Sequence, residues 1–330
     1  MKIGVIGIGG KTGTMFASEL KNSGEVFGIG KKENLEKIKE KKIFIEKNQK
    51  RECLENISLI EENEFPKEIN FDFLFLCVKN PVFNVVKCYY QKIKEKNFLP
   101  PALFLSQNGI EAGEDAILAL REVFGENSKE IPVFRISLFN AVEKKIEEEK
   151  IIISYSLPVR LAISQIFGKK MQIKDFFEKT KIKAFFVSQK DSKNMEYSKL
   201  FLNLIGMVCA LENLSISEGF KNKEVFKKEV LALREYIRAV KKNGGKFLNF
   251  PRYPVKILSL IFQLPLPLLF LISPFLGNLI EKERRGKKKE LDEIDYYQGA
   301  VIKLAKKVNL EAKINEEILE KAKKQCILKG

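Results

Sequence analysis

The stretch that decides the fold is residues 1–13, MKIGVIGIGGKTG, in which an apolar run leads directly into a cluster of glycines. The run Lys2–Ile6 is typical of a buried parallel strand, and apolar side chains at helical spacing in residues 15–20 indicate a helix that starts near Thr14. Glycines between such a strand and helix let the backbone approach a pyrophosphate at the positive end of the helix. The stretch therefore predicts a dinucleotide-binding turn.

The glycine spacing departs from the usual dinucleotide fingerprint. The pattern GxGxxG would place its third glycine at Thr12, whereas Gly13 makes the pattern GxGxxxG, so we expect a loop that is one residue longer. The expected cofactor-binding residues of this turn are Gly7, Ile8, Gly9, Gly10, Lys11, Thr12 and Gly13. An ordinary glycine-rich turn between a strand and a helix is the alternative interpretation.

Two lysines follow the second expected strand, residues 25–29. Enzymes that prefer NAD usually carry an acidic residue here, which holds the ribose hydroxyls. Lys31 and Lys32 instead suit a 2′-phosphate, so the sequence favours NADPH/NADP as the cofactor, with Lys31 among the residues that bind it. The alternative is that both lysines begin an exposed, lysine-rich helix.

The composition describes a globular protein with a basic surface. Of 330 residues, 45% are hydrophobic, and 59 Lys and Arg against 43 Asp and Glu give a net charge of +16. This charge favours anionic ligands, but the lysines are scattered and no nucleic-acid motif accompanies them, so no nucleic-acid partner is expected. The chain has no histidine, which excludes every mechanism that needs imidazole. Its five cysteines lack a CxxC spacing and predict neither a disulfide framework nor a metal site.

Strands and helices alternate along the first half of the chain, and the remainder is helical. The expected strands are residues 2–6, 26–29, 71–78, 102–105, 133–138 and 184–187, with a charged turn at 143–150 before a pair of strands at 151–156 and 160–166. Helices are expected near 35–41 and at 82–93, 112–124, 173–179, 198–211, 225–242 and 294–308. The predicted fold class is α/β, with an N-terminal Rossmann-like doubly wound domain (1–187) followed by an all-helical C-terminal domain (188–330).

Residues 257–280 carry no charge and are followed by a basic segment, a pattern that a membrane span can share. Pro265, Pro267 and Pro274 interrupt a continuous helix and favour a buried helix and turn. Interfacial attachment and a true span stay as alternatives.

Polar residues follow two of the expected strands, where ligands of doubly wound sheets bind. Lys79 lies in the segment CVKNP after the first of them, and Asn108 lies in SQNG after the second. Both are expected to line the cofactor crevice.

In the helical half, Lys199 and Asn203 stand four residues apart, which places an ammonium and an amide on one helix face. Apolar neighbours indicate that this helix is largely buried. Burial disfavours a charged lysine and brings its pKa towards neutrality, as a general acid requires. The alternative is a structural lysine whose stem is buried and whose ammonium reaches solvent.

Taken together, these segments resemble the ketopantoate reductases, which use NADPH to reduce 2-dehydropantoate to pantoate. The resemblance spans nearly the whole chain and rests on the glycine turn, CVKN, SQNG, SKLFLN and ELDEIDYYQGA. It implies that Lys199 is the general acid that protonates the carbonyl oxygen as hydride arrives at the adjacent carbon. It further implies that Asn203 and Glu293 hold the substrate, with Asn108 beside them, and that Lys79 and Asn108 position the nicotinamide. A cytoplasmic enzyme of pantothenate and coenzyme A biosynthesis, monomeric or homodimeric, is the corresponding expectation.

The sequence departs from the family pattern at two substrate positions. A second asparagine is replaced by Met207, and a serine before the glutamate is replaced by the charged stretch from Glu281. Arg284, Arg285 or Lys287 are candidates to bind the substrate carboxylate instead. The departures leave two alternatives open: a reductase of another branched 2-oxo acid, or a non-catalytic nucleotide-binding relative at a membrane surface.

Overall fold

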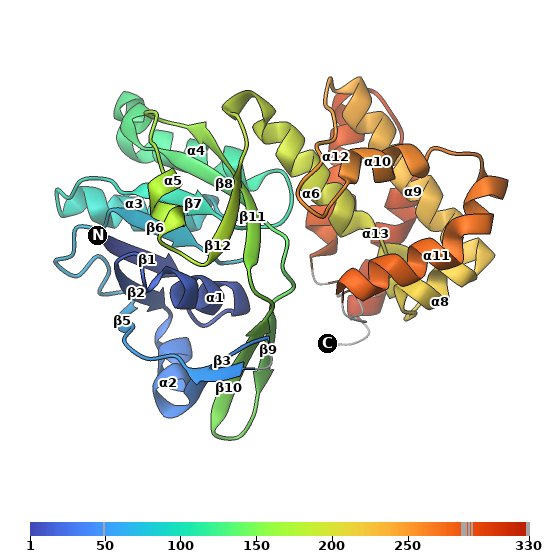
Figure 1. The fold of residues 1–330 in the computed structure, drawn as a ribbon. Coiled ribbons are helices and arrows are strands. Elements are labelled where there is room, and N and C mark those ends of the chain that lie inside the picture. The colour runs from blue at the N-terminus through green and yellow to red at the C-terminus, as the bar shows by residue number, and fades with distance from the viewer. Residues whose placement is uncertain (49, 285–288, 290, 292, 328–330) are drawn as a thin grey trace. The chain divides into compact units, whose positions relative to one another are not determined.

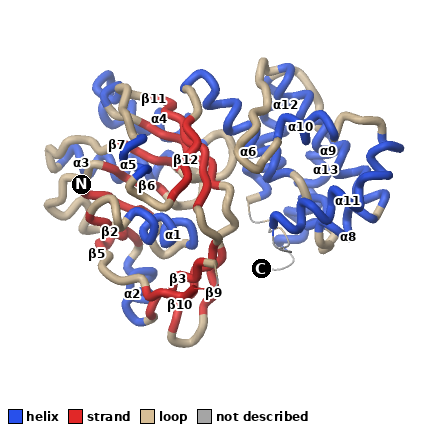
Figure 2. The backbone as a smooth tube through the Cα atoms, viewed as in Figure 1, coloured by secondary structure: helices blue, strands red, loops and turns tan. Residues whose placement is uncertain are grey.

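The computed structural model describes residues 1–48, 50–284, 289, 291 and 293–327 (Figure 1). The chain forms two compact units. The first comprises Met1–Gln107 and Glu111–Ser192, and the second comprises Asn108–Ile110 and the chain from Lys193 onward. Among the described residues, strands occur in the first unit and the second is built from helices (Figure 2). The predicted fold class is confirmed.

The first unit is organised around an eight-stranded sheet in the order β12-β11-β8-β7-β6-β1-β2-β5. All neighbouring strands are parallel except β8 and β11. The strands are β1 (Lys2–Ile6), β2 (Glu25–Gly30), β5 (Ser58–Glu61), β6 (Phe73–Leu76), β7 (Ala102–Leu105), β8 (Val133–Leu138), β11 (Val159–Phe167) and β12 (Ile182–Phe186).

Helices cover both faces of this sheet, which makes it doubly wound. They are α1 (Lys11–Leu20), α2 (Lys32–Glu40), α3 (Phe83–Glu95), α4 (Ala112–Phe124) and α5 (Lys174–Glu178), with a 3₁₀ helix η1 (Gly125–Glu130) after α4. Successive residues of each strand alternate between two cores. Phe75 and Phe104, with ring centroids 4.5 Å apart, pack with α1 and α5, whereas Leu74 and Leu103 pack with α3 and α4.

A second, four-stranded sheet has the order β4-β3-β10-β9 and was not predicted in full. Its strands are β3 (Lys42–Lys47), β4 (Lys50–Cys53), β9 (Glu143–Ile146) and β10 (Lys150–Tyr155). The expected pairing of residues 151–156 with 160–166 is wrong, because β10 pairs with β3 and β9 whereas β11 pairs with β8 and β12. Residues 143–150 are likewise not only a turn, since β9 begins at Glu143.

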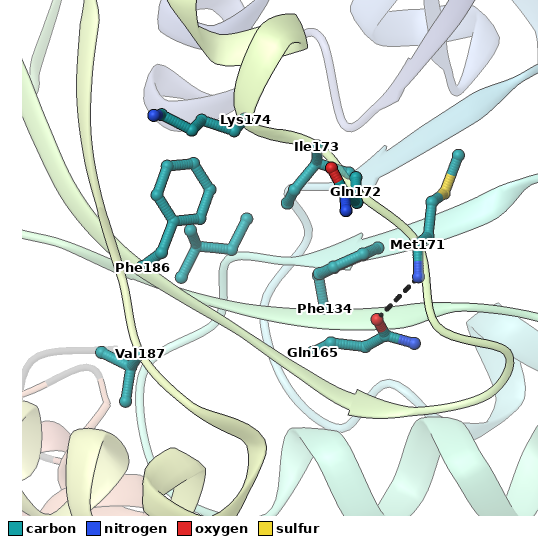
Figure 3. Close-up of a pocket in the computed structure, with 9 residues that line it drawn as sticks. Phe134, Gln165, Met171, Gln172, Ile173, Lys174, Phe186 and Val187 are labelled. Carbon is teal, nitrogen blue, oxygen red and sulfur yellow. Dashed lines mark hydrogen bonds between the residues drawn. The ribbon is translucent and has the colours of Figure 1, made fainter.

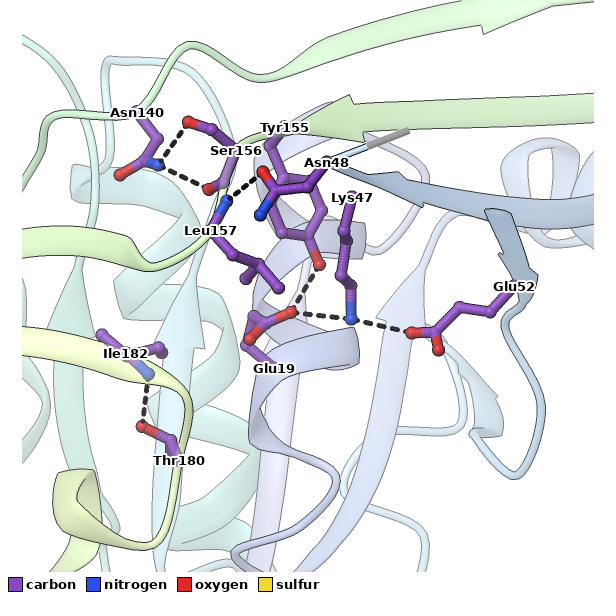
Figure 4. A network of polar contacts seen from close by, with 10 residues as sticks. All are labelled: Glu19, Lys47, Asn48, Glu52, Asn140, Tyr155, Ser156, Leu157, Thr180 and Ile182. Atoms are coloured by element: carbon purple, nitrogen blue, oxygen red, sulfur yellow. Dashed lines mark hydrogen bonds and ion pairs between the residues drawn. The ribbon is translucent and has the colours of Figure 1, made fainter. Parts of the chain in front are cut away.

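A buried polar network attaches α1 to this second sheet (Figure 4). The Glu19 carboxylate accepts a hydrogen bond from the Tyr155 hydroxyl at 2.7 Å and pairs with Lys47 at 2.8 Å. Burial lowers the pKa of Lys47, but its hydrogen bonds with Glu19 and Glu52 outweigh burial and leave that pKa raised. The C-terminal end of α1 is thereby anchored to the second sheet, which helps to position the whole helix.

The described part of the second unit consists of helices and their connections. They are α6 (Ser192–Leu204), preceded by the 3₁₀ helix η2 (Gln189–Asp191), and α7 (Met207–Leu211), α8 (Ile216–Lys221), α9 (Lys223–Lys242), α10 (Val255–Ile261), α11 (Leu266–Arg284), α12 (Ile294–Lys307) and α13 (Lys313–Ile327). The single helix expected at 198–211 is wrong. Gly206, at φ +87°, breaks it into α6 and α7.

The uncharged segment 257–280 forms α10 and most of α11. In the part of the chain that the structure describes, no helix is sufficiently long and apolar to cross a membrane. Leu269 and Leu276 of α11 are buried, whereas Leu271 and Phe275 are exposed. The expectation of a buried helix therefore holds for one face of α11 and fails for the other.

Candidate functional site

The glycine turn between β1 and α1 is shaped so that only glycine fits at two of its positions. Gly7 lies at φ +91°, and a Cβ there would stand 3.0 Å from the carbonyl oxygen of Cys77. A Cβ on Gly13 would stand 2.3 Å from the carbonyl oxygen of Gly7. Gly13 thus provides the close packing of helix against turn that the usual fingerprint assigns to its third glycine.

The helix after this turn begins earlier than expected. Gly10 is the N-cap, α1 starts at Lys11 rather than Thr14, and the extra residue of the pattern lies in the helix instead of lengthening the loop. The Thr14 hydroxyl donates to the carbonyl oxygens of Ile8 at 2.6 Å and Gly10 at 3.0 Å, which fixes the turn. The first turn of a helix presents N–H groups for which the helix has no acceptor, and such groups bind phosphate. The backbone here fits a pyrophosphate.

Three lysines near this turn are exposed cations. Lys31 is the N-cap of α2 and Lys32 is its first residue, directly after β2. Lys144, from β9, donates to the carbonyl oxygen of Gly9 at 2.6 Å. Burial and, to a lesser extent, the charge of Lys37 lower the pKa of Lys144. Lys144 was missed from the sequence because it lies 135 residues from Gly9, in a segment interpreted as a turn.

The ends of β6 and β7 are tied together by side chains. The Gln107 amide donates to the carbonyl oxygens of Leu76 at 2.9 Å and Val78 at 3.0 Å, and the buried Arg135 guanidinium donates to Gln107 O at 3.0 Å. Lys79 follows Val78 and is exposed. These bonds hold the CVKN segment at the carboxyl edge of the sheet, where the cofactor crevice was expected.

In the second unit, three of the predicted substrate residues form one hydrogen-bonded chain. The Asn203 amide donates to Asn108 Oδ1 at 3.2 Å, and the Asn108 amide donates to Glu293 Oε2 at 2.8 Å. The Tyr297 hydroxyl, one turn further along α12, donates to the same carboxylate oxygen at 3.1 Å. Lys199 lies one turn before Asn203 on α6 and is half-buried. Tyr297 was not predicted, although its spacing of four residues from Glu293 was the available signal.

Met207 does not continue the face of α6 that carries Lys199 and Asn203, because the helix breaks at Gly206. The buried Glu229 carboxylate holds this break by accepting from the backbone N–H groups of Gly206 at 2.6 Å and Val208 at 2.9 Å. Burial raises the pKa of Glu229 to about 7, against the lowering effect of these bonds. Met207 itself is buried and so belongs to the core of this unit.

A further cation stands at the end of α6. The Lys289 ammonium donates to the carbonyl oxygens of Asn203 and Leu202, the terminal positions that cations favour. Arg285 and Lys287, predicted to bind a carboxylate, lie outside the described residues, as does the Arg284 side chain. Glu281 lies at the other position where the sequence departs from the family pattern. Its carboxylate accepts from the N–H of Ser217 at 2.6 Å and so links α11 to α8.

A pocket of about 230 Å³ opens elsewhere in the first unit, beside β11, β12 and α5 (Figure 3). Phe134, Ile163 and Phe186 make it largely apolar, and Lys174 is the titratable residue of its lining. It offers no pair of groups for acid–base chemistry. Among described residues, no three His, Cys, Asp or Glu side chains are grouped to hold a metal ion.

The fold and the glycine turn define the class as a Rossmann-type dinucleotide-binding protein with a helical second unit. Residues 3–128 match the family model described as ketopantoate reductase PanE/ApbA. The predicted resemblance to this family of oxidoreductases is confirmed. No curated protein matches the sequence.

Solved structures share the fold over nearly the full chain at low sequence identity. A PanE/ApbA family ketopantoate reductase from Ralstonia eutropha is 13% identical, with a TM-score of 0.72 over 98% of this chain and 97% of that one. A ketopantoate reductase from Staphylococcus aureus, described as dimeric, is 16% identical, with a TM-score of 0.62 over 100% of both chains. A D-mandelate dehydrogenase solved with NADH and anilino(oxo)acetate is 16% identical, with a TM-score of 0.65 over 98% and 97%. Proteins described as ketopantoate reductases and as a D-mandelate dehydrogenase therefore share this fold.

Proposed function

We propose that this protein is an NADPH-dependent reductase of a 2-oxo acid, with 2-dehydropantoate as the leading substrate and pantoate as the product. The observation that carries the proposal is the chain of hydrogen bonds from Asn203 through Asn108 to Glu293, one helical turn from Lys199. The family match and the glycine turn support it. In this proposal residues 1–187 bind the cofactor and residues 188–330 bind the substrate.

The proposed chemistry needs a proton donor beside a ketone. A bound dihydronicotinamide supplies the hydride. The Lys199 ammonium stabilises the alkoxide that develops on the carbonyl oxygen and protonates it, and this requires neither imidazole nor metal. Asn203 and Glu293 bind the hydroxyl and carbonyl groups of the substrate, and Asn108 fixes the Glu293 carboxylate in place. Tyr297 adds a second donor to that carboxylate.

The proposed cofactor is NADPH rather than NADH. The first turn of α1 binds the pyrophosphate, a role that the close approach of Gly13 to Gly7 makes possible. Lys31, Lys32 and Lys144 bind the 2′-phosphate as point charges, with no acidic residue at the end of β2 to repel it. Lys79 and Asn108 position the nicotinamide.

The substrate carboxylate requires a cation, and we assign this role to Lys289. Its ammonium stands at the carbonyl of Asn203, the same end of α6 as the proposed substrate amide. The buried Met207 cannot replace the missing polar group, so substrate preference is set by Lys289 and Asn203. A cytoplasmic role in pantothenate and coenzyme A biosynthesis follows if 2-dehydropantoate is preferred.

The test is steady-state kinetics with purified full-length protein, NADPH and a panel of 2-oxo acids that includes 2-dehydropantoate, 2-oxoisovalerate and benzoylformate. We expect NADPH oxidation with 2-dehydropantoate at the highest kcat/KM and a weaker rate with NADH. A higher kcat/KM for another acid changes the substrate but keeps the reductase. Tight NADPH binding without turnover on any acid would contradict the proposal and favour a non-catalytic nucleotide-binding protein.

A further inference from the structure

Exposed apolar side chains gather on α10 and α11, among residues that the proposed reaction does not use. Fourteen large apolar side chains of the described chain are strongly exposed, and eight of them lie from residue 257 to residue 279. These eight, called here the α10–α11 stripe, are Ile257, Leu260, Leu264, Leu268, Leu271, Ile272, Phe275 and Leu279. Single exposed apolar residues are ordinary, but a concentration of this kind marks an interaction surface.

The stripe forms one side of α11, and the opposite side is packed inside the unit. Leu268 is followed by exposed apolar residues three, four, seven and eleven positions later, which places all five on one side of the helix. Leu269, Ser273 and Leu276 are buried on the other side. The helix therefore presents a continuous apolar face, as helices that lie along a membrane interface do.

The stripe lies in a stretch of the chain that contains cations but no carboxylate. No Asp or Glu occurs between Glu235 and Glu281. The same stretch carries six cations, all of them exposed, namely Arg238, Lys241, Lys242, Lys246, Arg252 and Lys256. Elsewhere in the chain lysines alternate with acidic residues, whereas here no acidic residue of the stretch offsets the positive charge. Such a stretch attracts an anionic surface.

Lysines border the stripe at both of its ends. Lys256 is exposed and lies one helical turn before Leu260 on α10. Lys282 is also exposed and follows Leu279 by three positions on α11. The long apolar stem of a lysine can lie along such a surface while its ammonium reaches polar groups beside it. The two lysines are therefore placed to contact headgroups while the stripe contacts apolar chains.

Two further cations reach the turn between α10 and α11. The Lys241 ammonium of α9 donates to Gln263 Oε1 at 2.7 Å. The Arg234 guanidinium of α9 donates to the carbonyl oxygens of Phe262 and Leu264, and Leu264 belongs to the stripe. Cations thus accompany the stripe at both ends and at its middle.

We propose that the α10–α11 stripe binds the surface of an anionic phospholipid bilayer, with α11 lying along the plane of the interface. The apolar side chains enter the boundary between headgroups and acyl chains, and the bordering cations contact the lipid phosphates. A second copy of the chain fits less well, because it would bring two sets of these cations together with no carboxylate of residues 236–280 to pair with them. The proposal does not rest on the proposed reaction.

The first test is co-sedimentation of the full-length protein with vesicles of phosphatidylcholine, with and without phosphatidylglycerol. We expect the wild type to sediment with the anionic vesicles, and a variant with Leu271→Asp and Phe275→Asp to partition onto them at least 10-fold more weakly. The matched control is Leu118→Asp, an exposed leucine of α4 outside the stripe, which should bind as the wild type does. A wild type that stays in solution, or equal binding of the double variant, would overturn the proposal.

The second test separates the bordering lysines from the net charge of the protein. Lys256→Gln with Lys282→Gln should weaken partitioning about fivefold for each lysine removed. Lys169→Gln with Lys174→Gln removes the same charge from two strongly exposed lysines of the first unit and should change partitioning little. Equal losses in the two pairs would show that binding follows the net charge alone, which contradicts the proposed site.

The third test needs no charged substitution, so it stays informative if the aspartate variant fails to fold. The chain has no tryptophan, and Phe275→Trp therefore carries a single reporter in the stripe. We expect its emission to shift to the blue on anionic vesicles, and the emission of Leu118→Trp to stay unchanged. A blue shift of Phe275→Trp that grows with protein concentration and is the same without vesicles would assign the stripe to a second copy and refute the lipid contact.

Discussion

The glycine turn and the Asn203–Asn108–Glu293 chain are built in opposite ways. The turn is one stretch of backbone, residues 7–14, and its shape depends on the absence of side chains at Gly7 and Gly13. The hydrogen-bonded chain is made only of side chains. Asn108 lies 95 residues from Asn203 and 185 residues from Glu293 in the sequence. A backbone site is formed by residues that are adjacent in the sequence, whereas a side-chain site forms only when folding brings distant residues together. The two sites should accordingly fail in different ways when changed.

Among the changes that compare these two sites, the largest effect is expected in the side-chain site. Glu293→Ala removes the acceptor shared by Asn108 and Tyr297, so we expect kcat/KM to fall about 100- to 1,000-fold because a misplaced substrate group costs catalysis heavily. Glu293→Gln keeps one acceptor oxygen and should recover part of the loss. NADPH affinity, measured by fluorescence titration, should stay unchanged in both. A parallel loss of NADPH binding would mean that the two sites are not separable.

The second effect concerns the support of α6, where Glu229 holds the break at Gly206. Its pKa is raised from 4.5 to about 7, so between these values the folded state holds a proton that the unfolded state has lost. The free energy of unfolding should therefore fall, by about 2 kcal/mol, as pH rises from about 5 to about 7.

Urea unfolding at both pH values measures this change. Glu229→Gln should be less stable than the wild type, because its amide nitrogen cannot accept from Gly206 or Val208, and should lack this part of the pH dependence. Glu212 is exposed, so the control variant Glu212→Gln should keep the pH dependence of the wild type. Equal pH dependence in the wild type and Glu229→Gln would refute the assignment.

A tenfold effect is expected in the backbone site. Gly13→Ala places a methyl group 2.3 Å from the Gly7 carbonyl oxygen, so the turn must open and NADPH should bind about 10-fold more weakly. Gly299→Ala is the matched control, since Gly299 also lies in a helix and its nearest neighbour atom is 3.9 Å away. Unchanged affinity in Gly13→Ala would show that the turn tolerates a side chain and is not the phosphate site.

The smallest effect is expected at Lys144, which the structure adds to the predicted cofactor-binding lysines. Lys144→Ala should weaken NADPH binding about fivefold and leave NADH binding nearly unchanged, because an exposed ammonium contributes at most about 1 kcal/mol to one phosphate. Lys145→Ala, its neighbour on β9, pairs with Glu147 and should change neither affinity. Equal losses for NADPH and NADH in Lys144→Ala would assign the lysine to the pyrophosphate instead.

The sequence was sufficient for features that depend on neighbouring residues. The glycine turn, the alternation of strands and helices in the first unit and the long helices α9 and α12 all follow from local patterns. The start of α1 was placed three residues late because Lys11–Gly13 carries no apolar periodicity and contains a glycine. The break at Gly206 was missed because the apolar pattern continues across it, and its stabilising partner, Glu229, lies 23 residues away.

The remaining features depend on topology. Strands β3, β4 and β9 are short and rich in lysine and glutamate, so no alternation identifies them. Without that sheet, Lys144 could not be placed beside Gly9. Asn108 and Asn203 were singled out by their places after a strand and on a helix face. Their common role with Glu293 was predicted only through the resemblance to ketopantoate reductases, since no spacing in the sequence connects the three. Tyr297 lies within the motif ELDEIDYYQGA, but only Glu293 of that motif was assigned a role.

The most direct measurement compares NADPH affinity and turnover of 2-dehydropantoate in the wild type, Lys199→Ala and the control Lys242→Ala, an exposed lysine of α9. We expect the three NADPH affinities to lie within twofold of one another. We also expect a turnover that is about 10²- to 10⁴-fold lower in Lys199→Ala alone, because only that variant loses the proton donor. Undiminished turnover in Lys199→Ala would contradict the role of Lys199 as the general acid.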